Sequence, residues 1–169
     1  MRLKVPIIIG IATALACARS SVQETYRRAD IDTLGQLRII TVDGRHIDPR
    51  KDGDQVAFDQ VTVSADHRSV GWVALYPNCC TSYPIPLKLI VLTDGRTRTL
   101  AGNGLPVWRW SFFADGKRIA FRQAPIHGED HSHFELRDLR TGRLVDRFDS
   151  DSASLREAPV WARVLKPPM

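Results

Sequence analysis

The 169-residue sequence lacks the short motifs that identify several large enzyme classes. It has no GxSxG elbow, no P-loop, no glycine-rich dinucleotide fingerprint and no HExxH pair. Serine, histidine and aspartate occur too often as single residues to define a catalytic triad. It also has no basic helix and no stripe of basic and aromatic residues, which makes nucleic acid an unexpected partner. The motifs therefore predict neither catalysis nor a cofactor.

Long apolar runs are absent except near the amino terminus. There, Arg2 and Lys4 precede the apolar stretch from Val5 to Ala18. This stretch is shorter than the about 20 apolar residues that span a bilayer. Basic residues followed by a short apolar run and small residues are typical of a secretory signal peptide. We predict a signal peptide over residues 1–18 and a periplasmic or secreted mature protein.

Two kinds of cleavage fit this segment. The pairs Ala16-x-Ala18 and Ala14-x-Ala16 suit an ordinary signal peptidase, whereas Ala14-Leu15-Ala16-Cys17 resembles a bacterial lipobox. In the second case Cys17 is lipidated and anchors the protein to the envelope membrane, and residues 19–36 form a polar lead-in that tethers the domain. Residues 37–169 are predicted to form a single domain.

Charge of one sign is not concentrated anywhere in the chain. The net charge is +5, and removal of residues 1–18 lowers it to +3 because Arg2 and Lys4 are lost and no acidic residue is. The remaining basic residues are scattered among acidic ones, which is typical of a solvated surface.

What the sequence does contain is a repeat. The segments VSADHRSVGW (Val63 to Trp72) and FFADGKRIAF (Phe112 to Phe121) align at a spacing of about 49 residues. Both predict a strand, a tight turn and a strand, with alternating apolar residues on one buried face. Asp115-Gly116 supplies the turn residues in the second copy, and His67 replaces the glycine in the first.

A second hairpin follows each copy. LKLIVLTDGRTRTL (Leu87 to Leu100) and HFELRDLRTGRLVDRF (His133 to Phe148) both place apolar alternation on either side of a Gly-Arg turn. Each repeat unit is therefore predicted to contain four strands.

Partial units flank the two full ones. LRIITVDGRHI (Leu37 to Ile47) is predicted to be another second hairpin, and PVWAR (Pro159 to Arg163) echoes PVWRW (Pro106 to Trp110) as an inner strand. The chain ends could pair with each other to close a ring, or pair with another copy to form a homo-oligomer. The sequence leaves both alternatives open. Trp108, Trp110 and Trp161 are predicted to pack in the core of the inner strands.

The string FFADGKRIAF followed by ELRDLRTGRL resembles a blade of the TolB-type, WD-repeat-like β-propellers, and the resemblance covers roughly residues 60–165. It implies that the Asp115-Gly116 turn and the turn from Asp138 to Gly142 join the four strands of a blade. The fold it implies is an all-β, propeller-like stack of four-stranded antiparallel sheets, with two full blades and partial ones at both ends, as in an incomplete propeller. It implies a scaffold rather than a chemistry.

Two long loops occupy matching places in the two units, between the second and third strands. They are LYPNCCTSYPIP (Leu75 to Pro86) and RQAPIHGEDHSH (Arg122 to His133). We expect both to project from the same rim of adjacent blades and to bind a protein or small-molecule ligand there. The predicted binding residues are Tyr76, Asn78, Cys79, Cys80, Tyr83, His127 and Glu129.

The neighbouring cysteines Cys79 and Cys80 have several interpretations. Export places them in an oxidising compartment. A disulfide between them would be strained, because adjacent Cα atoms lie about 3.8 Å apart and disulfides usually join Cα atoms about 4.4 to 6.8 Å apart. The pair could be a redox-labile ring, a soft-metal site, a rigid apolar knuckle for a ligand, or a loop staple or two small buried thiols.

The second loop also carries a candidate metal site. His127, His131 and His133 could gather around one zinc or copper ion, although His127 would need the loop to curl back. A solvated polar loop explains the same residues. The sequence therefore predicts an exported, non-catalytic binding or assembly module of the bacterial envelope, and the alternative is a metal- or redox-dependent envelope protein.

Overall fold

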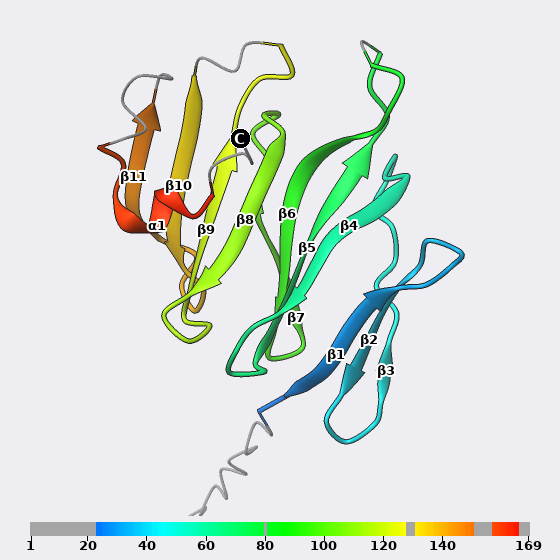
Figure 1. Ribbon diagram of the computed structural model, residues 1–169. Coiled ribbons are helices and arrows are strands. Elements are labelled where there is room, and N and C mark those ends of the chain that lie inside the picture. Colours follow the sequence, from blue (N-terminus) through cyan, green and yellow to red (C-terminus); the bar gives the residue numbers. More distant parts are fainter. Residues whose placement is uncertain (1–22, 80, 128–130, 151–156, 166–169) are drawn as a thin grey trace, which may run out of the picture.

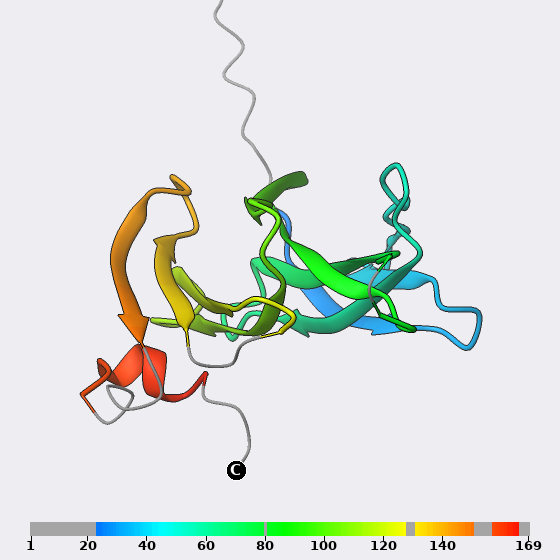
Figure 2. The same ribbon diagram turned by 90° about the horizontal axis from the view of Figure 1, so that it is seen from above.

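The computed structural model describes residues 23–79, 81–127, 131–150 and 157–165. These residues form three antiparallel sheets of three, four and four strands, which lie side by side in chain order (Figures 1 and 2). The predicted signal peptide with Cys17 lies outside the described residues, as do Cys80 and Glu129.

The two full repeat units form the second and third sheets. The second sheet has the order β4 (Ala57–Val63), β5 (Ser69–Tyr76), β6 (Ile85–Thr93) and β7 (Arg96–Ala101). The third sheet contains β8 (Val107–Phe113), β9 (Arg118–Gln123), β10 (Ser132–Asp138) and β11 (Leu144–Ser150), again with neighbours in sequence paired. Each sheet is an up-and-down meander, so the prediction of two hairpins per unit is confirmed. Four-stranded meanders in a row are a propeller-like arrangement.

The matching turns of the two units share a left-handed backbone. Asp115 and Gly116 have φ values of 53° and 85°, and His67, which replaces the glycine, has a φ of 59°. Two hydrogen bonds to Tyr26 hold His67 in this backbone conformation, which is uncommon for a residue other than glycine. Its carbonyl accepts a hydrogen bond from the Tyr26 N–H (2.7 Å), and its ring nitrogen Nδ1 donates to the Tyr26 carbonyl (2.8 Å). His67 therefore connects this turn to the first sheet.

The first sheet contains β1 (Tyr26–Ile31), β2 (Leu37–Thr41) and β3 (His46–Ile47). The hairpin of β2 and β3 confirms the prediction for Leu37 to Ile47. Strand β1 lies within residues 19–36, where a polar lead-in was expected, and that expectation was wrong for β1. The sequence gives only a weak signal for a strand here, because few side chains of β1 are apolar. Tyr26 is nevertheless fully buried, and β1 pairs along the length of β2.

Two apolar layers hold the three sheets together. Between the first and second sheets, Tyr26, Leu37 and Ile39 pack against Val70 and Trp72. Between the second and third sheets, a layer is formed by Val73, Leu89, Val91, Leu100, Ala101, Val107, Ile119, Phe121 and Leu139. In both units, the alternating apolar side chains that the sequence predicted to be buried thus face the preceding sheet. They are Val70 and Trp72 in the second sheet and Ile119 and Phe121 in the third. Strand β5 is buried on both of its faces, because its sheet lies in the middle.

The carboxy-terminal PVWAR segment is not the inner strand that the sequence predicted. It forms the short helix α1 (Val160–Arg163), which lies beside the third sheet in Figure 2. Ala158, Ala162 and Leu165 pack against Ala120, Phe134 and Leu136, on the face of the third sheet turned away from the second. A lone strand would leave its backbone N–H and C=O groups unpaired, since no partner strand follows within residues 157–165, whereas a helical turn pairs some of them internally.

The three tryptophans that were predicted to pack in the core of the inner strands differ in their packing. Trp110 packs against the layer between the second and third sheets, as expected for a core residue. Trp108 is half-buried and donates from Nε1 to the Ala124 carbonyl (3.0 Å), beyond an irregularity in the pairing of β8 with β9. Trp161 is half-buried on α1, and its Nε1 donates to Asp146 Oδ2 (3.0 Å). The expectation that Trp108 and Trp161 occupy equivalent inner strands is therefore wrong.

The far face of the first sheet is polar. Arg28 and Asp30 form an ion pair there (3.0 Å), and Arg38 lies opposite Asp30 in the strand pairing. The row of described sheets thus ends in a charged face on one side and in α1 on the other, and no ring is closed among them. Within the described residues, no helix has both the length and the apolar character needed to cross a bilayer.

Candidate functional site

The two long loops emerge at the same end of the second and third sheets, which we call the loop rim (described residues 77–79, 81–84, 124–127 and 131; Figure 1). Cys79 and His127 are exposed, and Tyr83 is 54% exposed. Tyr76 is half-buried, with Lys88 Nζ 5.1 Å from its ring centroid. Asn78 donates a side-chain hydrogen bond to Thr81 Oγ1 (3.2 Å).

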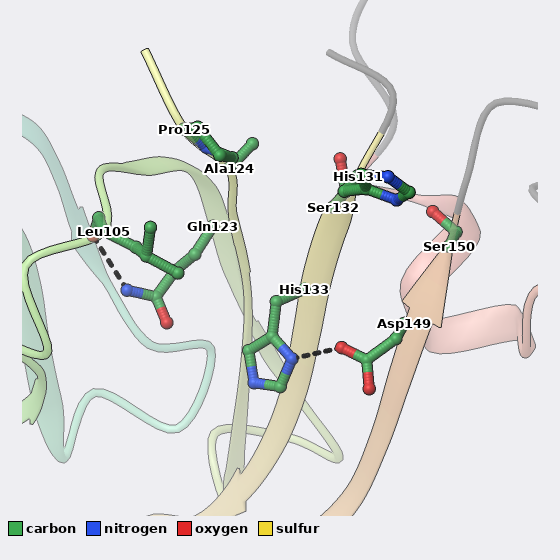
Figure 3. A pocket seen from close by; sticks show the side chains of 9 residues that line it. All are labelled: Leu105, Gln123, Ala124, Pro125, His131, Ser132, His133, Asp149 and Ser150. Atoms are coloured by element: carbon green, nitrogen blue, oxygen red, sulfur yellow. Dashed lines mark hydrogen bonds and ion pairs between the residues drawn. The ribbon is translucent and has the colours of Figure 1, made fainter. Parts of the chain in front are cut away.

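A hollow of about 330 Å³ lies at the loop rim on the third sheet (Figure 3). The ends of β9, β10 and β11 supply its polar side chains, which are those of Gln123, His131, Ser132, His133, Asp149 and Ser150. The hollow therefore includes two histidines that the sequence singled out. The hollow is not lined by the predicted binding residues at the other loop, which are Tyr76 at the end of β5 and Asn78, Cys79 and Tyr83 in the loop itself.

His133 is held between two carboxylates. Its Nδ1 lies 2.5 Å from Asp149 Oδ1 on the neighbouring strand β11, and its Nε2 lies 3.0 Å from Glu135 Oε1 on its own strand. Arg137 continues the row, with its Nε 2.5 Å from Glu135 Oε2. Strand alternation explains this geometry, because residues 133, 135 and 137 share one face of β10 and Asp149 is the cross-strand partner of His133.

The two carboxylates favour the charged form of the imidazole. Burial lowers the pKa of His133, but the hydrogen bonds to Asp149 and Glu135 and their negative charges outweigh burial and raise it above the ordinary value of 6.5. Burial raises the pKa of Glu135, and its hydrogen bonds to Arg137 and His133 outweigh this and lower it. The row is thus a chain of alternating charges, in which both ring nitrogens of His133 donate.

This arrangement does not match a serine-type catalytic triad. In such a triad the imidazole nitrogen remote from the aspartate accepts the proton of the nucleophilic hydroxyl. Here the remote nitrogen Nε2 of His133 is occupied by Glu135. The Ser132 hydroxyl accepts a hydrogen bond from Arg122 Nε (2.9 Å) instead.

Ser150 presents a buried polar group to the hollow. The residue is only 5% exposed, and within the described part of the chain its hydroxyl has no hydrogen-bond partner. Leaving a buried hydroxyl unpaired costs about 1–3 kcal/mol. A bound group that exchanges a hydrogen bond with Ser150 Oγ would recover this free energy.

Gln123, which is 1% exposed, lines the floor of the hollow near Ser150 and is held in place by hydrogen bonds. Its amide nitrogen donates to Asn103 Oδ1 (2.7 Å) and to the Leu105 carbonyl (2.8 Å), and the second of these bonds is drawn in Figure 3. These bonds fix the loop before β8 against the end of β9. The walls of the hollow therefore belong to a rigid part of the sheet.

The candidate metal residues are not assembled as a metal site. His127 and His131 are exposed, while both nitrogens of His133 contact carboxylates. Among the described residues, no group of three or more His, Cys, Asp and Glu side chains is placed to hold a metal ion.

Sequence reasoning missed Asp149, Glu135 and Ser150. Glu135 lies in β10, and Asp149 and Ser150 are the last two residues of β11. The signal that could have found the pair is the hairpin register, since the turn at Gly142 brings His133 opposite Asp149.

Comparisons with known proteins add little to this geometry. No protein family profile and no curated protein matches the chain. Among solved structures, it is similar to an acylaminoacyl peptidase from Pyrococcus horikoshii, with 8% identity and a TM-score of 0.46 over 78% of this chain and 26% of that one. It is also similar to hydrazine synthase from Kuenenia stuttgartiensis, with 14% identity and a TM-score of 0.45 over 76% of this chain and 34% of that one. The chain thus spans about a quarter of the length of the first protein and about a third of the length of the second.

Proposed function

We propose that this protein is an exported, non-catalytic binding module of the bacterial envelope, which holds its ligand at the loop rim. The observation that supports this proposal is the buried, unpaired hydroxyl of Ser150 in a rigid hollow at that rim. A buried polar group without a partner favours a ligand that supplies one.

The state of His133 favours binding over proton transfer. A general base needs a free lone pair and a pKa near the working pH. Both ring nitrogens of His133 face carboxylates, and the charged form of the ring is favoured. His133 thus connects β10 to β11 through Asp149 and lines the wall of the hollow.

The proposal can be tested by placing a photo-crosslinking amino acid at His131, which is exposed and lines the hollow, in protein exported by its native host. A matched position is Val42, which is 58% exposed in the turn between β2 and β3, far from the loop rim in Figure 1. We expect a discrete adduct from position 131, identified by mass spectrometry, and none from position 42. The Ser150→Ala variant should weaken the adduct.

Adducts of equal yield at both positions, or no adduct at position 131, would contradict the proposal. Chelation and thiol reduction separate it from the metal- or redox-dependent alternative. A binding module keeps its adduct under both treatments, whereas a protein that depends on His127 or Cys79 loses it.

A further inference from the structure

A second, larger hollow lies at the end of the sheets opposite the loop rim. It has a volume of about 910 Å³ and runs between the second and third sheets. Four turns line it, those between β4 and β5, β6 and β7, β8 and β9, and β10 and β11 (Figure 1). We call it the turn groove. Its volume is within the usual range for small-molecule sites, which is roughly 300–1,000 Å³.

The turn groove is rich in basic side chains. Five of them line it, namely Arg68, Arg96, Arg98, Lys117 and Arg140, together with the three carboxylates of Asp66, Asp94 and Asp138. Two of these carboxylates are already used by the turns. Asp66 Oδ1 accepts from Ser64 Oγ (2.6 Å), and Asp138 Oδ1 accepts from the Thr141 N–H and hydroxyl (both 2.7 Å).

Four of the five cations have no side-chain hydrogen bond or ion pair within the described residues. The exception is Arg98, whose Nη1 donates to the Leu139 carbonyl (3.2 Å) and so connects the two sheets. Arg68, Arg96 and Lys117 therefore reach the turn groove from three different turns without a side-chain hydrogen bond or ion pair within the described residues. Arg140 differs, because its charge, after the hydrogen bonds from Thr141, helps to lower the pKa of Asp138.

The floor of the turn groove is apolar. Val91, Leu100 and Leu139 line it, and all three belong to the layer between the second and third sheets. An anion that binds here would meet basic groups at the walls and hydrocarbon at the base. A low-dielectric floor strengthens the attraction of the walls for an anion.

We propose that the turn groove binds a small organic anion, which consists of an oxyanion group and an apolar body. The oxyanion is held by Arg96 of the second sheet and Lys117 of the third, and the apolar body lies on Leu100 and Leu139. Guanidinium groups match both carboxylate and phosphate oxygens. The carboxylates of Asp66 and Asp94 in the walls disfavour a densely charged polyanion. This site is separate from the loop rim and does not depend on the function proposed there.

The test is titration of the mature protein with hexanoate, hexyl phosphate and hexanol, followed by amide chemical shifts at low ionic strength. We expect one or both anions to bind and to shift the amides of the four turns, while the neutral hexanol leaves them unchanged. The tighter of the two anions identifies the oxyanion as a carboxylate or a phosphate. Binding should weaken as salt is added, since the walls are exposed.

A charge-matched pair of variants tests the assignment. The double variant Arg96→Gln and Lys117→Gln should bind the preferred anion with about tenfold lower affinity. This is the loss expected when a charge-assisted hydrogen bond is removed. The control double variant Arg27→Gln and Arg147→Gln removes the same charge from exposed side chains that do not line the groove. It should bind as the parent does, and thermal melts should show that both variants are folded.

Equal weakening in both double variants would overturn the proposal, because it would mean that net charge alone attracts the anion. Unchanged binding in the groove variant, or hexanol binding as tightly as the anions, would overturn it as well.

Discussion

Replacing Gly116 with alanine should destabilise the protein more than the same change at another glycine of equal backbone conformation. Gly116 has a φ of 85° and lies in the turn between β8 and β9. An added Cβ would lie 2.8 Å from Asp66 Cγ and 3.0 Å from Ser64 Cβ, and closer still to Asp66 Oδ1. These atoms belong to the equivalent turn of the preceding repeat unit, so the two turns pack directly on each other.

The expected cost has two parts. Placing a residue with a Cβ in the left-handed region costs about 1–2 kcal/mol of conformational free energy relative to glycine. Displacing Asp66 also weakens its hydrogen bonds from Ser64 Oγ (2.6 Å) and the Arg68 N–H (3.1 Å), at about 1 kcal/mol each. Gly116→Ala should therefore lower the free energy of unfolding by about 3–4 kcal/mol.

Gly44→Ala is the matched control. Gly44 has a φ of 88°, and nothing lies within 4 Å of the Cβ that would be added there. It should lose only the backbone part, about 1–2 kcal/mol. Urea denaturation measures both losses, and an unchanged m-value would show that the two-state comparison holds.

A double-mutant cycle isolates the contact between the turns. In an Asp66→Ala background, Gly116→Ala should cost less than it does in the parent, because only the contact of the added Cβ with Ser64 Cβ remains. If Gly116→Ala and Gly44→Ala cost the same in the parent, or if the two changes at 66 and 116 are additive, the contact between turns contributes nothing and the reasoning fails.

Two further predictions concern the charged row and the amino terminus. Because the folded pKa of His133 is raised above 6.5, its stabilising effect is complete below that pH and is lost as the pH rises through the folded pKa. Urea denaturation from pH about 6 to about 9 should therefore show a fall in stability that His133→Gln lacks, and equal pH dependence in the two proteins would refute the role of the ring. Intact mass of the natively exported protein should show loss of the signal peptide, with a lipid on Cys17 if the lipobox is used, and a mass that retains residue 1 would exclude export by cleavage.

Much of the fold followed from local sequence. The alternation in Val70 and Trp72, repeated at Ile119 and Phe121, correctly predicted strands and the faces they bury, because a strand presents every second side chain to the same sheet. The turn at Asp115-Gly116 was predicted for a similar reason, since few residues adopt its backbone.

The failures lie where tertiary contacts overrode local pattern. Strand β1 has too few apolar residues to be recognised, and it forms because β2 pairs with it and Tyr26 fills a space beneath the turn of His67. The PVWAR segment shares its first three residues, Pro-Val-Trp, with the PVWRW segment at the start of β8. It differs because β8 has β9 to pair with and α1 has no such partner among the described residues.

The candidate site shows the same division. The sequence correctly placed the two long loops at one end of adjacent sheets, and it singled out His131 and His133. It did not reveal that Asp149 and Glu135 hold His133, because Asp149 becomes its neighbour only through the register of a hairpin. The convergence of four turns at the turn groove is likewise invisible in the sequence, where its basic residues are spread from Arg68 to Arg140.

The sequence by itself determined the repeat, the four strands of each unit and the turns between them, since these depend on side-chain alternation and backbone preference within a few residues. Only the tertiary structure decided which faces pack together, which side chains share a hollow, and whether the last segment is a strand or a helix. Those outcomes depend on partners far apart in the chain, whose contacts form only when the sheets stack and bury their apolar faces.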